Sequence, residues 1–331
     1  MKPFFFYLTN TVYLLGFLVI ILFTGCDDSP DDDRALGRFY IENLTLANYP
    51  KVDGSTSTEP LQILIASRLF NVECNWIYSP IMWWTEYPYH LAPAADKNPE
   101  VARFIFEKIH HFGTHSSFVN LINKYTDLIL VARTASKDEI HLADSLEVNL
   151  IETPIALDAF IFLANINNTV NSLTTKQIQD IYTGQITRWN QVGGSDIRIQ
   201  PYMRDRNSGS QELMESLVMK DLTMINLPDM IVEGMMGLVN RIEYDKNGLG
   251  YSVYFYTQFM IRSDSIKLLA VDGVFPEFTT LKNNEYPYTT DVYAVIRSDL
   301  DTTSTAFKLY QLLLTTQGQN VISESGYIPY Y

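Results

Sequence analysis

Hydrophobic positions along the chain alternate between strand-like runs and helix-like stripes. Apolar runs at residues 127–132 and 155–164 have the length of buried strands. Two stripes with the helical repeat of three and four residues lie at Leu61, Leu64, Ile65 and Leu69, and at Phe118, Leu121, Ile122 and Tyr125. Strands and helices that alternate in this way predict an α/β fold with mainly parallel sheets.

Capping chemistry marks where several helices begin. Pro60 suits the first turn of the helix after residues 54–58, and Thr174 with Gln177 three residues later predicts a capping box. Gly184 is placed to end that second helix. We also expect a helix over about 99–111, a strand over 198–202, and a helix that opens after the turn at 204–210.

Residues 71–100 have no such period. Aromatic side chains are dense here (Trp76, Tyr78, Trp83, Trp84, Tyr87 and Tyr89), and prolines at 80, 88, 93 and 99 interrupt them. The pattern favours an ordered aromatic loop that packs over one lobe. A partner-binding surface is the alternative.

The N-terminus indicates the compartment. Residues 4–23 are an uncharged, mostly apolar stretch preceded by Lys2, as in a signal peptide or a single membrane anchor. Residues 22–26 (Leu-Phe-Thr-Gly-Cys) resemble the lipobox of bacterial lipoproteins, with Phe23 in place of the usual Leu. We therefore expect a lipoprotein signal peptide over 1–25, lipidation of Cys26, and an acidic tether over 26–38. Signal peptide and retained anchor both put the rest of the chain outside the cytoplasmic membrane.

Composition narrows the function further. The chain has 331 residues, 47% of them hydrophobic, which is enough for two domains or one bilobal unit. A net charge of −14 argues against nucleic acid as a partner. The two cysteines, Cys26 and Cys74, form neither a disulfide framework nor a metal-type spacing, so we expect no metal and no cofactor. The sequence also lacks the common zinc-protease and nucleophile-elbow motifs, so we expect no enzyme.

Three predicted helices each follow a turn rich in Gly, Ser and Thr, at 54–58, 113–117 and 208–210. The N-terminus of a helix presents unpaired N–H groups and the positive end of the helix dipole, so it attracts anions. Ser or Thr at one helix start is usually only a cap. Arg133 and Arg204 add planar guanidinium forks that suit two oxygens of an oxyanion. Together these features predict an anion site.

The chain resembles the PstS-type phosphate-binding proteins of bacterial phosphate ABC importers. The resemblance covers most of residues 50–330 and is carried, in the family's order, by residues 53–61, 126–133, 181–190, 204–211, 250–252, 318–319 and 326–329. The most specific segments are Tyr182-Thr183-Gly184 with Trp189-Asn190, and Arg204 with Ser208-Gly209-Ser210.

The resemblance implies two α/β lobes joined by two crossover strands, near residues 154–156 and 288–292. Lobe 1 would comprise 39–155 and 292–331, and lobe 2 would comprise 156–291. The implied ligand is phosphate, which the chain would deliver to the membrane subunits of an ABC importer. The chain would be a monomer, held at the membrane through its lipid anchor and facing the periplasm or the exterior. The implied phosphate-binding residues are Ser55, Thr56, Ser57, Thr114, Ser116, Arg133, Arg204, Ser208, Gly209 and Ser210.

Two departures from the family pattern matter. Ala132-Arg133 stands where well-known members carry an Asp that accepts the proton of hydrogen phosphate, which opens sulfate or another oxyanion as the ligand. Arg133 is either a second clamp on the anion or an ion-pair partner of Asp138 or Glu139. The segment 71–100 is also longer than in the family. The alternative function is therefore an oxyanion-binding surface lipoprotein for sensing or scavenging, without coupling to transport.

Overall fold

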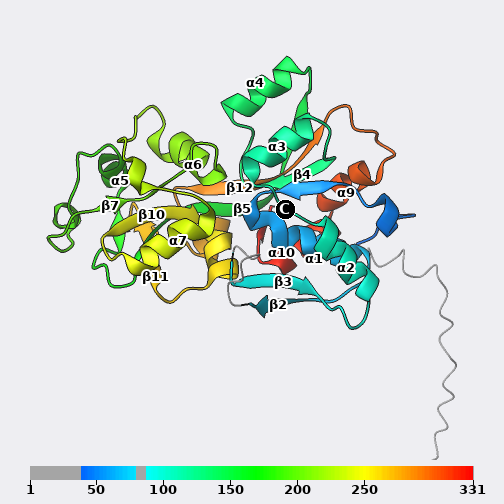
Figure 1. Cartoon of the computed structure of the whole chain (residues 1–331), viewed down its shortest axis with the longest axis horizontal. Coiled ribbons are helices and arrows are strands. Elements are labelled where there is room, and N and C mark those ends of the chain that lie inside the picture. Colours follow the sequence, from blue (N-terminus) through cyan, green and yellow to red (C-terminus); the bar gives the residue numbers. More distant parts are fainter. Residues whose placement is uncertain (1–38, 80–86, 331) are drawn as a thin grey trace, which may run out of the picture. The chain divides into compact units, whose positions relative to one another are not determined.

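Two long strands, β5 (Leu150–Asn165) and β12 (Thr289–Arg297), run antiparallel through the centre of the main sheet (Figure 1). The computed structural model describes residues 39–79 and 87–330. The order of strands across the sheet is β1-β4-β12-β5-β10-β7. β5 and β12 thus join the two halves of the sheet, and both contain the segments expected to be crossovers. The lobe boundaries themselves stay a prediction.

One half of the sheet continues from β12 to β4 (Leu128–Val131) and then to β1 (Val52–Gly54), which pairs parallel with β4. The helices of this half lie to the right in Figure 1. They are α1 (Glu59–Leu69), α2 (Pro99–Lys108), α3 (Thr114–Ile122), α4 (Lys137–Ser145), α9 (Thr305–Leu313) and α10 (Thr316–Ser325). The last strand, β13 (Ile328–Pro329), pairs with β5 at residues 156–157.

The other half begins where β5 leaves β12 and pairs with β10 (Gly248–Val253) and β11 (Ile266–Val271). Its remaining strands are β6 (Ser172–Leu173), β7 (Gln200–Pro201), β8 (Met203–Arg204) and β9 (Ile231–Val232). Its helices are α5 (Thr175–Tyr182), α6 (Gly209–Leu213), α7 (Met235–Tyr244) and α8 (Phe278–Lys282). Residues Phe160 to Ala164 of β5 are fully buried, as their apolar run predicts.

The α/β class is confirmed, but the expectation of mainly parallel pairing is wrong. The longest ladders, β5 with β12, β10 and β11, are antiparallel. Parallel pairing is restricted to short ladders such as β1–β4 and β7–β10. The reason is that two long strands of opposite direction pass through the middle of the sheet, and every neighbour of β5 pairs antiparallel to it.

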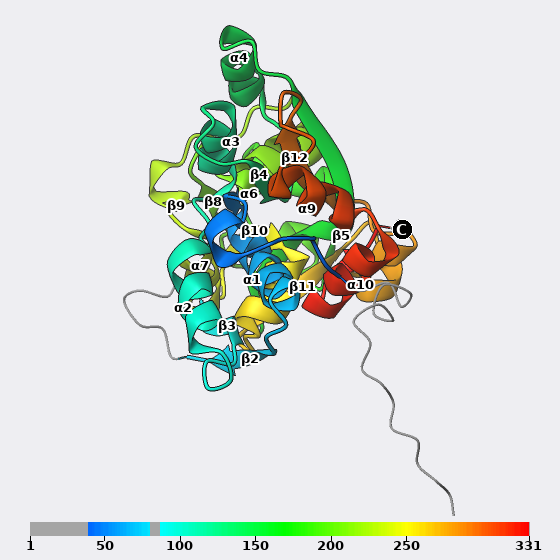
Figure 2. The same ribbon diagram turned by 90° about the vertical axis from the view of Figure 1, so that its right-hand side faces the viewer.

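The aromatic segment is also not the loop that the sequence predicts. It contains an antiparallel hairpin of β2 (Cys74–Tyr78) and β3 (Tyr89–Pro93), in register from Cys74 opposite Pro93 to Tyr78 opposite Tyr89 (Figure 2). Aromatic and aliphatic residues favour strands, and the prolines fall at or beyond the ends of the paired segments. Trp76 packs 6.2 Å from Phe259, and the Arg262 guanidinium lies 4.6 Å from the Tyr89 ring centroid. Trp76 and Tyr89 therefore pack against the body of the chain, whereas Ile77 and Tyr78 of the same hairpin are exposed.

Some sequence predictions fall on residues that lie outside the described ones. These are the signal peptide over 1–25, lipidation of Cys26, the tether over 26–38, and Trp83 and Trp84 within the aromatic segment. Over 39–79 and 87–330, the structure has no helix with the length and apolar character that crossing a membrane requires. Cys74 is half-buried and lies 2.8 Å from the Ser67 hydroxyl.

A buried carboxyl lies within the central strand β5. Asp158 is almost fully buried, and its Oδ1 accepts hydrogen bonds from the backbone N–H groups of Ala159 (2.8 Å) and Phe255 (3.0 Å). Its Oδ2 is buried without a hydrogen-bond partner among the described residues. Burial disfavours the charged form and raises the pKa of Asp158 from 3.8 to about 7, although the backbone hydrogen bonds act in the opposite direction.

Candidate anion-binding site

A cavity of about 240 Å³ lies where three turns meet. The turns precede α1, α3 and α6, so they come from both halves of the sheet. The cavity is lined by Ser55, Thr56, Ser57, Phe112, Gly113, Thr114, His115, Ser116, Ala132, Arg204, Asp205, Asn207, Ser208, Gly209, Ser210, Leu213, Met235 and Val253. It therefore brings together all of the residues predicted to bind phosphate except Arg133.

The turn before α1 is shaped by Gly54. A Cβ at this position would lie 2.3 Å from the Leu130 carbonyl oxygen and 2.6 Å from Thr58 Oγ1, so no larger residue fits without a shift. The Ser55 N–H donates to the same carbonyl at 3.0 Å, and Thr58 Oγ1 donates to it at 2.7 Å. These bonds fix residues 55–57 at the carboxyl end of β1, on one wall of the cavity.

The turn before α3 lies beside the first. Ser55 Oγ is 2.7 Å from Thr114 Oγ1 and accepts a hydrogen bond from the Ala132 N–H at 3.1 Å. Gly113 has a φ of 82° at the N-cap, a conformation that favours glycine. Thr114, His115 and Ser116 follow in the first turn of α3, where backbone N–H groups have no partner within the helix. Hydroxyls and N–H groups therefore converge on this wall.

The opposite wall is built around Arg204. Its side chain is about 7% exposed, and three contacts fix the guanidinium: Nε donates to the Val232 carbonyl (3.0 Å), Nη1 to Ser210 Oγ (3.4 Å) and Nη2 to Asp205 Oδ1 (3.2 Å). Ser208 is the N-cap of α6 and accepts from the Gln211 N–H at 3.2 Å. The guanidinium is thus positioned before any ligand arrives.

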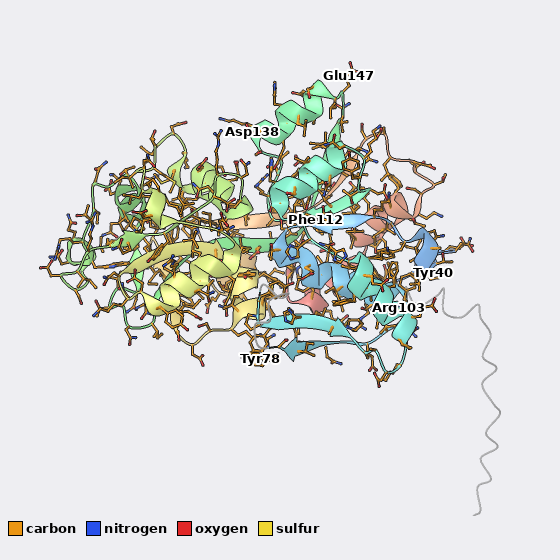
Figure 3. The ribbon with its side chains drawn as sticks, viewed as in Figure 1. Tyr40, Tyr78, Arg103, Phe112, Asp138 and Glu147 are labelled. Atoms are coloured by element: carbon orange, nitrogen blue, oxygen red, sulfur yellow. The ribbon has the colours of Figure 1, made fainter. Side chains whose placement is uncertain are left out.

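The two walls come into close contact at Gly209. A Cβ built on Gly209 would lie only 2.4 Å from Thr114 Oγ1, so glycine is required for this approach of α6 to α3. Phe112 lines the same cavity and is 64% exposed. Its N–H donates to Asp53 Oδ1 of β1 at 3.0 Å, and Figure 3 labels Phe112 beside this strand. The cavity is therefore narrow where Gly209 meets Thr114, and it opens to solvent beside Phe112.

Arg133 does not line the cavity. Its Nη1 and Nη2 donate to Glu139 Oε2 and Oε1 at 2.7 and 2.8 Å, and the Arg133 carbon Cζ lies 5.5 Å from the ring centroid of Phe118. Both charged side chains are buried, with Glu139 at 0% and Arg133 at 6% exposure. Of the two alternatives for Arg133, the structure favours the ion pair with Glu139.

Sequence reasoning missed several lining residues. Asp205 and Asn207 stand between Arg204 and Ser208, and His115 stands between Thr114 and Ser116, so each lies in a segment that already carried the anion signal. Met235 opens α7 more than twenty positions further along the chain, and no local pattern points to it. Within the described ranges, no three His, Cys, Asp or Glu side chains are arranged to hold a metal ion.

Comparisons with known proteins agree with this fold. The phosphate-binding protein PstS of Borreliella burgdorferi is 22% identical over 222 residues, which are 65% of this chain and 77% of that protein. Protein SphX of Synechococcus elongatus is 23% identical over 235 residues, 66% and 67% of the two chains. PstS of Bacillus subtilis is 24% identical over 181 residues, 54% and 58% of the two chains.

Solved structures share the architecture. A phosphate ABC transporter substrate-binding protein of Clostridium perfringens, with bound phosphate, has a TM-score of 0.63 at 22% identity. The aligned region covers 86% of this chain and 100% of that structure. An ABC-type phosphate transport receptor of Vibrio cholerae has a TM-score of 0.58 at 18% identity, and the aligned region covers 84% of this chain and 98% of that structure. The fold is therefore the bilobal α/β fold of periplasmic binding proteins. A family model described as a PBP superfamily domain matches residues 113–310, and the chain belongs to this superfamily.

Proposed function

We propose that this chain is an extracytoplasmic solute-binding protein that captures phosphate in the cavity between the two halves of its sheet. One observation carries the proposal: turns from both halves direct hydroxyl groups, helix N-termini and the buried guanidinium of Arg204 at one cavity of about 240 Å³. A small oxyanion matches such a site, because each of its oxygens accepts several hydrogen bonds. The names of the PstS relatives support phosphate as that oxyanion.

The proposed binding residues are Ser55, Thr56, Ser57, Thr114 and Ser116 from one wall, and Arg204, Ser208, Gly209 and Ser210 from the other. Removing an anion from water is costly, so the hydrogen bonds it loses must be replaced on binding. Because neither wall alone surrounds the cavity, approach of the two walls completes the set of donors. Binding then shifts an equilibrium between open and closed states. Arg133 enters this proposal only through its support of the wall behind Ala132.

The chain would deliver phosphate to the membrane subunits of an ABC importer. A phosphate ABC transporter protein and an ABC-type transport receptor among its structural relatives support the fold that this role requires. We propose lipidation of Cys26 as the attachment to the membrane, a monomeric chain in the cell envelope, and lobes with the boundaries 39–155 plus 292–331 and 156–291. We also propose that the chain binds without catalysis.

Isothermal titration calorimetry of the full chain, stripped of bound ligand, tests the function. We expect one phosphate per chain and weaker binding of sulfate. Arg204→Ala should weaken phosphate binding at least about 100-fold, since hydrogen bonds to charged groups contribute about 1.5–3 kcal/mol each. Arg206→Ala is the matched control, because Arg206 is exposed in the same turn and does not line the cavity. Absence of phosphate binding by the unmodified chain would refute the proposal.

A further inference from the structure

The cavity is rich in hydrogen-bond donors, but one lining side chain is held so that it presents an acceptor. His115 lies in the first turn of α3, and its Nδ1 is 2.9 Å from Glu139 Oε1. A neutral imidazole carries a hydrogen on one ring nitrogen and a lone pair on the other. Which nitrogen of His115 carries the hydrogen therefore depends on whether Glu139 donates or accepts a hydrogen bond at Nδ1.

Glu139 can only accept from that nitrogen. Its side chain is fully buried and already receives hydrogen bonds from both Arg133 nitrogens, Nη1 and Nη2, and from the Ser136 N–H at 2.7 Å. A carboxylate that is paired with a buried guanidinium in this way has lone pairs and no hydrogen to offer. The His115 nitrogen that faces it must be N–H. The hydrogen is thus on Nδ1, and Nε2 of the neutral ring has a free lone pair.

His115 lines the cavity, and its ring is enclosed on one side only. The His115 side chain is 31% exposed, whereas Glu139 on its Nδ1 side is 0% exposed. The N–H and lone-pair directions of the two ring nitrogens diverge, so Nε2 points away from the buried carboxylate and is the ring nitrogen left for a ligand in the cavity that His115 lines. A carboxylate behind a histidine fixes both its tautomer and its orientation. The Arg133–Glu139 pair thereby gains a role at the site without touching the ligand.

We infer that His115 is a specificity-determining residue that accepts a hydrogen bond from a protonated oxyanion. This inference rests on the proposed function. Phosphate retains at least one P–O–H hydrogen at neutral pH and donates it to Nε2. Sulfate is fully ionised, so its oxygen would face the lone pair with no hydrogen between them, and that contact is repulsive. His115 then favours phosphate over sulfate, although Ala132-Arg133 offers no carboxylate at that place in the chain.

Asp205 is the competing acceptor in the cavity. Its carboxylate is 46% exposed, and its Oδ1 already accepts from Arg204 Nη2 at 3.2 Å. An exposed carboxylate is well solvated and is held by one contact, whereas His115 is held by a buried ion pair. His115 is therefore the acceptor with the fixed direction.

The test measures the dissociation constants of phosphate, arsenate and sulfate by calorimetry at neutral pH and fixed ionic strength, on the full chain. His115→Phe should lower the ratio of the sulfate to the phosphate dissociation constant about tenfold or more, which corresponds to about 1.4 kcal/mol. The arsenate-to-phosphate ratio should not change, because arsenate is also protonated. A merely structural role of the ring would change affinity for all three anions together. His115→Gln, which keeps an acceptor oxygen, should retain part of the selectivity.

His141→Phe is the matched control, since His141 is exposed on α4, the helix that carries Glu139. An unchanged sulfate-to-phosphate ratio in both His115 variants would overturn the inference, as would loss of selectivity in Asp205→Asn alone. Nitrogen NMR of the imidazole in the unliganded chain gives a readout that does not depend on phosphate. A hydrogen on Nδ1 with none on Nε2 supports the inference, and a hydrogen on Nε2 overturns it. Failure of the unmodified chain to bind phosphate would instead refute the proposed function.

Discussion

Replacing Asp158 by Asn should remove a large part of the pH dependence of the chain's stability. Burial raises the pKa of Asp158 from 3.8 to about 7 in the folded chain, whereas the unfolded chain has the ordinary value. Between these two pH values the folded chain holds a proton that the unfolded chain has released. The free energy of unfolding therefore falls as pH rises, by about 1.4 kcal/mol per pH unit.

The total follows from the size of the shift. A difference of about 3 pH units corresponds to about 4 kcal/mol. This stability is fully present below about pH 4 and is lost as pH rises through about 7. Between pH 5 and pH 8 the loss from Asp158 alone is about 3 kcal/mol, and above pH 8 almost no further loss comes from this group.

Urea unfolding of the full chain at pH 5 and pH 8 measures this effect. The unmodified chain should lose about 3 kcal/mol more between the two pH values than Asp158→Asn does, because Asn cannot ionise but can still accept from the Ala159 and Phe255 N–H groups. Asp229→Asn, at an exposed position, removes the same charge from a solvated site and should leave the difference intact. Equal losses in the unmodified chain and Asp158→Asn would refute the reasoning.

Three further predictions concern contacts around the cavity. Gly209→Ala places a methyl group 2.4 Å from Thr114 Oγ1 and should weaken phosphate binding about tenfold or more in calorimetry, because the two walls can no longer approach; an unchanged dissociation constant would contradict this. Arg133→Met leaves the buried Glu139 without its guanidinium partner and should lower the urea unfolding free energy by about 3–5 kcal/mol. Most of this loss should be regained in the double variant with Glu139→Met, and a single variant of full stability would count against the pair. Tyr327→Phe removes the 3.0 Å bond from the Tyr327 hydroxyl to the Ser57 carbonyl and should cost about 1 kcal/mol, whereas Tyr244→Phe, 90% exposed, should cost nothing measurable.

Local signals in the sequence predicted the helix starts well. Thr174 and Gln177 form the capping box that their spacing indicates, and Pro60 lies in the first turn of α1. The three turns that converge on the cavity were also visible, because Gly, Ser and Thr before a helix start are a short-range pattern. One helix end was misplaced: α2 ends at Lys108, so His110 and His111 lie beyond it.

The structural features that the sequence did not predict depend on contacts between segments that are far apart in the chain. The β2–β3 hairpin is stabilised by Phe259 and Arg262, which follow it by more than 150 positions. Its prolines, taken as a local pattern, predict a loop instead. The choice between the two alternatives for Arg133 required knowing that α4 turns Glu139 toward it. The acceptor His115 was hidden for the same reason, since its state is set by that buried pair.

The hydrogen bond from Tyr327 to Ser57 and the pairing of β13 with β5 have a consequence for the order of events during synthesis. The turn at 55–58 emerges early from the ribosome, but its partner emerges 270 residues later. The central strand likewise lacks one neighbour until residues 328–329 exist. A nascent chain therefore lacks this support of the cavity wall until nearly all of it has been translated. If the proposed lipoprotein crosses a membrane unfolded, this wall gains its support only on the far side.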